Sequence, residues 1–262
     1  MGKKIRWIIM AAALLVFLGS GGAALVIHGR YQASRQGYAD AAAAYTQAAA
    51  PGSSEVGGQA EGSGDASADA DRPPITVDFQ RLQADNPEVV AWLYCAGTAI
   101  DYPVVQGGDN DFYLHHNYTG AEDQSGAIFL DAQCAPGFAD SNSILYGHSM
   151  NDGSMFGGLE AWKSQEYYEA HPVMWLLTPE ASYRVRLFSG YTTSARSDTY
   201  AIYRGPGEDF SQYLSNCQAQ SDFSAEAELD GDGRYVVLST CAYEFDEARY
   251  VLHGRLEKVD TR

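Results

Sequence analysis

A cysteine and an arginine lie eight residues apart near the end of the chain, in the segment LSTCAYEFDEARYVLHGRL. Cys241 ends one apolar run and Arg249 begins the next. If the two runs are neighbouring strands, alternation can point both side chains at one spot. A guanidinium is permanently charged, so it lowers the pKa of a nearby thiol and stabilises the oxyanion that forms when a thiolate attacks a carbonyl. The spacing therefore suggests a nucleophilic cysteine with an electrostatic partner.

A histidine with the right surroundings for acid/base chemistry occurs 93 residues earlier, in SILYGHSMNDGSMFGG. His148 follows an apolar strand and a glycine, where the chain should emerge into a polar loop, and such strand ends present reactive groups. A histidine there can protonate a leaving amine and later deprotonate an incoming one. The histidine precedes the cysteine, unlike the order in papain-like proteases, where the cysteine comes first and begins a helix.

Each of these residues also has a structural explanation when it is taken alone. Cys241 follows a run expected to be a buried strand, and free cysteine is among the most buried residue types. Arg249 alone is better explained by a surface ion pair with Asp246 or Glu247. His148 alone could be an ordinary loop histidine. The chemical interpretation depends on the three residues acting together.

Disulfides are an alternative use of the cysteines. The chain has four, and an exported domain permits two disulfides, but a nucleophilic Cys241 leaves an odd number. Cys95 lies in an apparent strand and is expected in the core. Cys134 and Cys217 lie in a loop and a helix, and the sequence leaves open whether they are free or paired.

A zinc site is a second alternative, built from His115, His116, His148 and Cys241. Adjacent histidines on a strand face opposite ways, so His115 and His116 could not easily bind one ion. No Cys-x-x-Cys or His-x-x-x-His spacing supports them. We therefore rank zinc binding below catalysis and expect neither a metal nor a cofactor.

The elements that must position these residues form a β-dominated domain. From residue 75 onward, short segments rich in Val, Ile, Tyr and Leu are separated by Gly, Asp, Asn and Pro. Near the start, residues 77–93 have helical spacing that Pro87 interrupts, which predicts a short helix near residues 78–85, a turn and then a strand. Further helices are expected over residues 154–171 and 208–220. The other candidate strands are residues 99–106, 126–131, 141–149, 173–179, 182–194, 233–241 and 249–259.

Two segments precede this domain. Residues 7–27 carry no charge, which predicts a transmembrane helix, and we assign residues 1–30 as a signal anchor. A cleaved signal peptide is the alternative, but the apolar run is too long for one. More positive charge lies before the run than after it, which favours a cytoplasmic N-terminus and an extracellular remainder. Residues 31–72 are rich in Ala, Gly, Ser and Asp and predict a low-complexity extracellular linker whose first part can extend as a helix.

The charge balance excludes one class of function. The 262 residues have a formal net charge of −17, and no run of charged residues is basic. A nucleic-acid binder needs clustered Lys and Arg to contact phosphates, so we do not expect nucleic acid as a partner.

Three segments together resemble a class B sortase. They are NPEVVAWLYCAGTAIDYPVVQGGDNDFYLHHNYTGAEDQSGAIFLD, ILYGHSMNDGSMFGGLEAW and LSTCAYEFDEARYVLHGRL, in the order in which that family has them. The resemblance covers about residues 73 to 258, so we assign residues 73–262 as a sortase catalytic domain. It implies an eight-stranded sortase β-barrel with an N-terminal helix and a helix in the connection before the cysteine strand.

The resemblance also implies roles for individual residues. His148 matches the catalytic histidine of the family, Cys241 the nucleophile and Arg249 the catalytic arginine. Three further positions match residues that lie beside the substrate: Asn110, Leu114 and Ser239.

The implied function is that of a cysteine transpeptidase. Sortases cleave the C-terminal sorting signal of a secreted protein after its Thr, hold the acyl part as a thioester and pass it to an amine. Class B implies an Asn-Pro-x-Thr type of signal and, as acceptor, an amine of a peptidoglycan precursor at the cell membrane of a Gram-positive cell. Two alternatives stay open: a pilus-type enzyme that joins pilin subunits through lysine, and a non-catalytic surface domain that only binds peptide.

Overall fold

The computed structural model describes residues 2–49, 72–241 and 246–259. Its contacts divide the chain into two units, Met1–Asp40 and Ala41–Arg262. The first unit is the greater part of helix α1 (Lys3–Tyr45). Over the part of the chain that the structure describes, no helix is long and apolar enough to cross a membrane. The transmembrane helix expected within residues 1–30 is therefore not confirmed.

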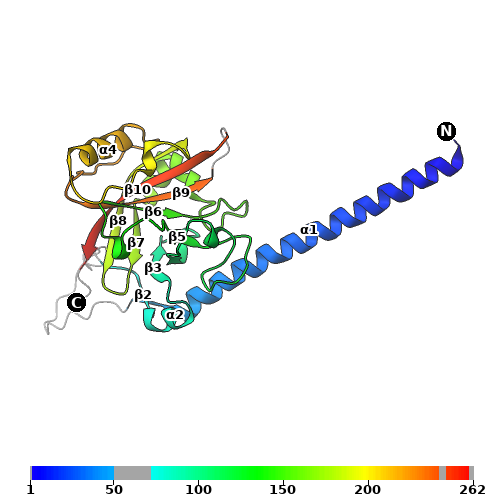
Figure 1. Ribbon diagram of the computed structural model, residues 1–262, viewed down its shortest axis with the longest axis horizontal. Helices are drawn as coiled ribbons and strands as arrows, with labels where there is room; N and C mark the ends of the chain where they lie inside the picture. The colour runs from blue at the N-terminus through cyan, green and yellow to red at the C-terminus, as the bar shows by residue number, and fades with distance from the viewer. Residues whose placement is uncertain (1, 50–71, 242–245, 260–262) are drawn as a thin grey trace, which may run out of the picture. The chain divides into compact units, whose positions relative to one another are not determined.

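The second unit is built around a closed barrel of eight strands, in the order β10-β8-β7-β3-β4-β5-β6-β9 (Figure 1). The barrel has the eight strands that the resemblance implied, and each candidate strand of the sequence has a counterpart in it. The strands are β3 (Val89–Tyr94), β4 (Asp101–Val105), β5 (Ile128–Leu130), β6 (Asn142–Tyr146), β7 (Val173–Leu177), β8 (Ser182–Ser194), β9 (Arg234–Cys241) and β10 (Ala248–Val259).

Strand direction determines which residues meet at each end of the barrel. Two neighbouring pairs are parallel, β4 with β5 and β6 with β9, and the other pairs are antiparallel. Because β6 and β9 run in the same direction, their C-terminal ends lie at the same edge of the barrel. Strand β10 runs the other way, so it begins at the edge where β9 ends. This edge holds the candidate catalytic residues.

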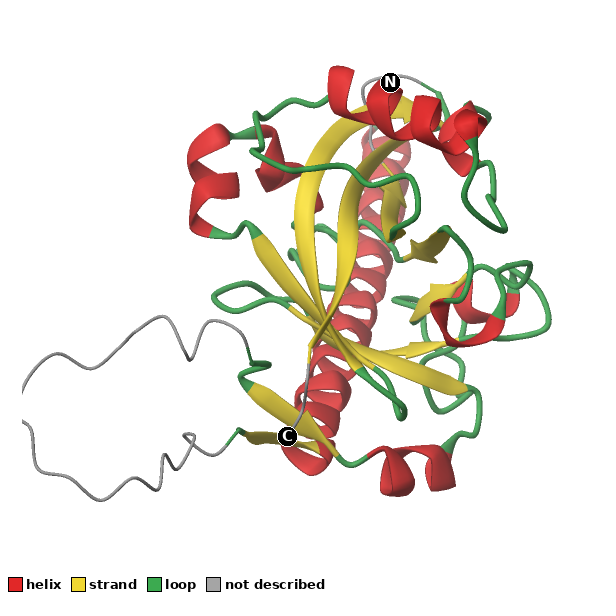
Figure 2. Ribbon diagram, turned by 90° about the vertical axis from the view of Figure 1, so that its left-hand side faces the viewer, coloured by secondary structure: helices red, strands yellow, loops and turns green. Residues whose placement is uncertain are grey.

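The helices of this unit lie outside the strands (Figure 2). The longer ones confirm the expected helices near residues 78–85 and 208–220: α2 (Phe79–Asp85) and α4 (Glu208–Ala219). The helix expected over residues 154–171 is instead two short pieces, the 3-10 helix η3 (Leu159–Lys163) and α3 (Gln165–Ala170). Ser164 separates them, because it has an extended backbone and its side chain accepts a hydrogen bond from the Tyr167 N–H as the cap of α3.

Two apolar clusters hold the unit together. One contains Trp92 of β3 and Leu82 of α2, and it also includes Ala41 and Tyr45 from the end of α1. After α1, strand β1 (Thr46–Ala48) pairs with β2 (Ile75–Val77). Residues 41–48, which the sequence led us to assign to the linker, are thus part of the folded unit, and residues 50–71 of that linker lie outside the described residues.

The second cluster lies between α4 and the barrel. Phe210 and Leu214 of α4 pack with Phe188 of β8 and Tyr235 of β9, and all four are almost completely buried. Burying a side chain of this size stabilises a fold by roughly 1.5 to 3 kcal/mol. The cluster therefore fixes the connection between β8 and β9, which contains α4, against the strand that carries Cys241.

Candidate active site

Cys241 differs from the other cysteines in its exposure. It is the last residue of β9 and is half-buried, whereas the other three cysteines are buried. Burial raises the pKa of Cys95 and of Cys134 to about 11 and also raises that of Cys217. All four thiols are free, so the disulfide alternative is wrong for these residues. Only Cys241 combines access with a place at the barrel edge.

Arg249 lies directly opposite Cys241. The two residues are partners in the antiparallel register of β9 and β10, so their side chains project from the same face. The Arg249 guanidinium donates a hydrogen bond from Nη1 to the Ala248 carbonyl at 2.9 Å. Glu247, one of the two acidic residues considered as its ion-pair partners, instead binds Arg196 at 3.0 Å. Among the residues that the structure describes, Arg249 forms no ion pair, which leaves its charge available to the thiol.

His148 reaches the same edge from the other side of β9. In the parallel register Tyr146 is opposite Ser239, and His148 and Cys241 each lie two residues beyond that pair. Gly147, between Tyr146 and His148, lets the chain pass close to β5, because a Cβ there would lie 2.5 Å from Ile128 Cδ1. The three predicted catalytic residues thus form a row at one edge of the barrel: His148 lies two residues past the end of β6, Cys241 ends β9, and Arg249 is the second residue of β10.

The imidazole of His148 is oriented by a main-chain carbonyl. Its Nε2 lies 2.7 Å from the Leu114 carbonyl oxygen. A carbonyl oxygen can only accept a hydrogen bond, so Nε2 carries the hydrogen and Nδ1 is the nitrogen that remains for proton exchange. This contact gives Leu114, which was predicted to lie beside the substrate, a position next to His148.

The other two predicted substrate residues are also held in place. Asn110 donates from Nδ2 to Asp131 Oδ2 at 2.9 Å and accepts the Ala132 N–H at 2.8 Å through Oδ1. Ser239, which is 2% exposed, shares a hydrogen bond of 2.7 Å with the Tyr200 hydroxyl. Asn110 is thus bound to the chain that follows β5, and Ser239 of β9 is bound to Tyr200.

Tyr200 is a site residue that the sequence did not reveal. It ends the 3-10 helix η4 (Asp198–Tyr200) in the connection between β8 and α4. Burial raises its pKa, while its hydrogen bond with Ser239 and the charge of Arg249 lower it and Cys241 raises it. Its ring is stacked near that of Tyr146, with centroids 6.3 Å apart and 16° between the planes. No local motif marks Tyr200, because only the tertiary fold brings this connection to the barrel edge.

A family model described as a sortase domain matches residues 93–257. The chain belongs to the sortase family. Sortase B from Listeria monocytogenes is 37% identical over 186 residues, which cover 70% of this chain and 75% of that protein. The crystal structure of sortase B from B. anthracis has a TM-score of 0.71 at 28% identity and covers 88% of this chain and 99% of its own. The Staphylococcus aureus sortase B-substrate complex has a TM-score of 0.66 at 29% identity. The match covers 70% of this chain and 85% of that one.

These likenesses confirm the class B assignment made from the sequence. As a sortase, the protein is a cysteine transpeptidase that acts on sorting-signal substrates. The individual roles of His148, Cys241 and Arg249 stay predictions, and their row at one edge of the barrel is the geometry on which a mechanism can be built.

The histidines of the zinc alternative have other surroundings in this sortase. The ring of His116 stacks on Phe112 with centroids 3.9 Å apart, and its Nδ1 lies 2.8 Å from the Phe112 carbonyl oxygen. His115 is exposed. Within the described ranges, no group of three or more His, Cys, Asp or Glu side chains could hold a metal ion.

Proposed function

We propose that this sortase cleaves the C-terminal sorting signal of secreted surface proteins after its threonine and transfers the protein to an amine of the cell wall. The observation that carries the proposal is the row of His148, Cys241 and Arg249 at one edge of the barrel. Its members have the chemistry of an acyl transfer: a nucleophile, an acid/base group and a fixed positive charge.

In the first half-reaction, the Cys241 thiolate attacks the threonine carbonyl carbon. Arg249, directly opposite in the strand register, stabilises the oxyanion of the tetrahedral intermediate. His148 donates a proton from Nδ1 to the leaving amine as the peptide C–N bond breaks, and the acyl group remains on sulfur as a thioester.

In the second half-reaction, His148 takes a proton from the acceptor amine. The amine nitrogen attacks the thioester carbon, and the Cys241 thiolate leaves. The hydrogen bond from His148 Nε2 to the Leu114 carbonyl keeps Nδ1 facing the exchange in both steps. We propose that Asn110, Leu114 and Ser239 contact the sorting signal: the first two lie on the segment that binds His148, and Ser239 precedes Cys241 by two positions on the same face of β9.

A library of sorting-signal peptides tests the proposal. We expect signals of the Asn-Pro-x-Thr type to give a hydroxylamine-sensitive acyl-enzyme that mass spectrometry places on Cys241. The Cys241→Ala variant should form none while its melting temperature changes little, because this residue is half-buried at a strand end. A library in which no peptide gives an acyl-enzyme would favour the non-catalytic peptide-binding alternative.

The acceptor and the location are separate parts of the proposal. Supplying the acyl-enzyme with cross-bridge peptides and with a lysine-containing pilin peptide identifies the amine by the product formed. A cell-wall enzyme uses the former and a pilus enzyme the latter. We place the catalytic domain on the outer side of the cell membrane, because its substrates are secreted. Protease treatment of intact cells should then remove the domain, and protection from protease would contradict this location.

A further inference from the structure

A buried carboxylate lies between the two segments that position the catalytic histidine. Asp131 directly follows β5 and is 5% exposed. Its Oδ2 accepts hydrogen bonds from Asn110 Nδ2 at 2.9 Å and from the Tyr146 hydroxyl at 3.0 Å, and its Oδ1 accepts the Gln133 N–H at 2.8 Å. Among the described residues, no cationic side chain pairs with Asp131. Its buried charge is therefore compensated by these donors alone.

The first contact leads to His148 through the segment that begins at Asn110. The amide of Asn110 is fixed at both ends, by Asp131 and by the Ala132 N–H. Four residues later the Leu114 carbonyl accepts the hydrogen bond from His148 Nε2. Releasing Asn110 would therefore free one end of the segment that orients the imidazole.

The second contact leads to His148 through its own strand. Tyr146 is the last residue of β6 and precedes His148 by two positions. Burial and the Asp131 charge raise the pKa of Tyr146, so its hydroxyl stays protonated and donates. Asp131 thus binds two parts of the chain that position the His148 imidazole. One is Tyr146, at the end of the strand that leads to His148, and the other is the segment whose Leu114 carbonyl binds Nε2.

We propose that Asp131 is a positioning residue that keeps His148 in the orientation with Nε2 protonated and Nδ1 available for proton transfer. It acts through Asn110 and Tyr146 and does not touch the reacting atoms. The role rests on the proposed function, because it concerns the histidine of that mechanism.

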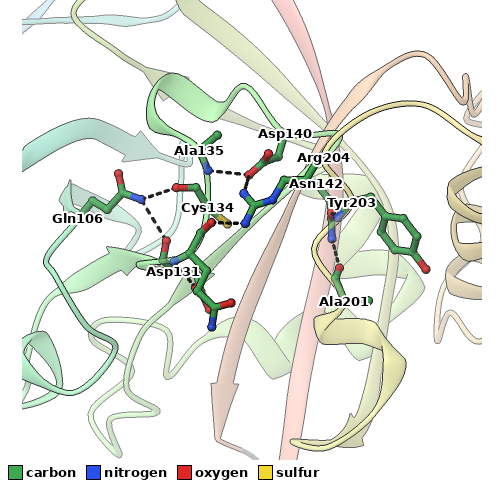
Figure 3. A network of polar contacts seen from close by, with 10 residues as sticks. Gln106, Asp131, Cys134, Ala135, Asp140, Asn142, Ala201, Tyr203 and Arg204 are labelled. Carbon is green, nitrogen blue, oxygen red and sulfur yellow. Dashed lines mark hydrogen bonds and ion pairs between the residues drawn. The ribbon is translucent and has the colours of Figure 1, made fainter.

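A second buried carboxylate in the same connection offers a matched control (Figure 3). Asp140 is 2% exposed, accepts the Ala135 N–H at 2.6 Å and pairs with Arg204 at 2.8 Å. Both carboxylates accept a main-chain N–H of the connection between β5 and β6. Asp140 differs in holding Arg204 and not the two residues that lead to His148.

The test compares Asp131→Asn with Asp140→Asn in the full chain. An asparagine at position 131 keeps the size of the side chain but replaces one acceptor oxygen with an NH2 group. That group must face either the donors of Asn110 and Tyr146 or the Gln133 N–H, so at least one hydrogen bond is lost. With ¹⁵N-labelled histidine at a pH where the imidazole is neutral, we expect wild-type His148 to be the Nε2–H tautomer and Asp131→Asn to show a mixture. At saturating peptide, kcat should fall at least tenfold in Asp131→Asn and stay within twofold of wild type in Asp140→Asn. This difference should hold even if both substitutions lower the melting temperature by the same amount.

The proposal is overturned if Asp131→Asn keeps the wild-type tautomer and kcat, or if Asp140→Asn loses as much kcat. If Asp131→Asn does not fold, Tyr146→Phe removes one of the two contacts and should shift the tautomer ratio in the same direction; an unchanged ratio refutes the proposal. If wild-type protein forms no acyl-enzyme, the proposed function fails, but the tautomer comparison still decides the role of Asp131.

Discussion

The buried histidine of β10 should make the fold sensitive to acid. His253 is 1% exposed, stacks on Tyr191 with ring centroids 5.3 Å apart, and has its Nε2 3.6 Å from Cys217 Sγ of α4. Burial lowers its pKa from 6.5 to about 3. None of the groups that face it from α4 or β8 carries a charge that would favour the imidazolium.

The lowered pKa becomes a dependence of stability on pH. Above pH 6.5 the imidazole is neutral in both the folded and the unfolded chain, so the free energy of unfolding does not depend on it. Below pH 6.5 the unfolded chain binds the proton and the folded chain does not, so stability falls by about 1.4 kcal/mol per pH unit. The loss from His253 is about 2 kcal/mol at pH 5 and reaches roughly 5 kcal/mol near pH 3.

Urea unfolding at pH 7, 6 and 5 measures this contribution. We expect His253→Phe, which keeps a ring of similar size against Tyr191, to lose stability with falling pH less steeply than wild type, by about 2 kcal/mol over this range. The exposed His115 supplies the control, since His115→Gln should leave the slope unchanged. Equal slopes for wild type and His253→Phe would refute the reasoning.

Three further outcomes follow from the site. In native protein at neutral pH, a thiol reagent should modify Cys241, and peptide mapping should find the other three cysteines modified only after unfolding. Gly147→Ala should lower the free energy of unfolding, measured in urea, by about 1 to 3 kcal/mol, since the added methyl group meets Ile128. Because residue 147 directly precedes His148, the same substitution should reduce acyl-enzyme formation. Tyr200→Phe should reduce kcat/KM about two- to tenfold through the lost bond with Ser239; an unchanged kcat/KM would contradict a role for that bond.

The pairing of Cys241 with Arg249 could be predicted because its causes are local. Alternating apolar residues and a short connection predict an antiparallel pair, and the spacing then determines which side chains share a face. The placement of His148 has no such local cause. Strands β6 and β9 are parallel and far apart in the sequence, and parallel register depends on the packing of the whole barrel. Only the resemblance to sortases indicated that His148 joins the pair.

Side-chain networks were the least predictable part of the site. Asp131 follows an ordinary apolar strand and Tyr200 lies in an irregular connection, so neither has a motif or a period that predicts its contacts. The break at Ser164 was missed for a related reason. The spacing of residues 154–171 is compatible with a single helix, but a serine can compete for the main-chain N–H groups and begin a new helix instead.

The mixed strand directions explain why this barrel can bring the three groups together at one edge. Reactive residues at the C-terminal ends of two parallel neighbours, β6 and β9, lie side by side without a turn between them. The start of the antiparallel β10 supplies Arg249 at the same level. Cys241 and Arg249 are held together by the register of β9 and β10, whereas His148 is oriented separately by the Leu114 carbonyl. A movement of the segment from Asn110 to Leu114 should therefore reorient His148 without displacing Cys241 or Arg249, because of the three residues only His148 is hydrogen-bonded to that segment in the described structure.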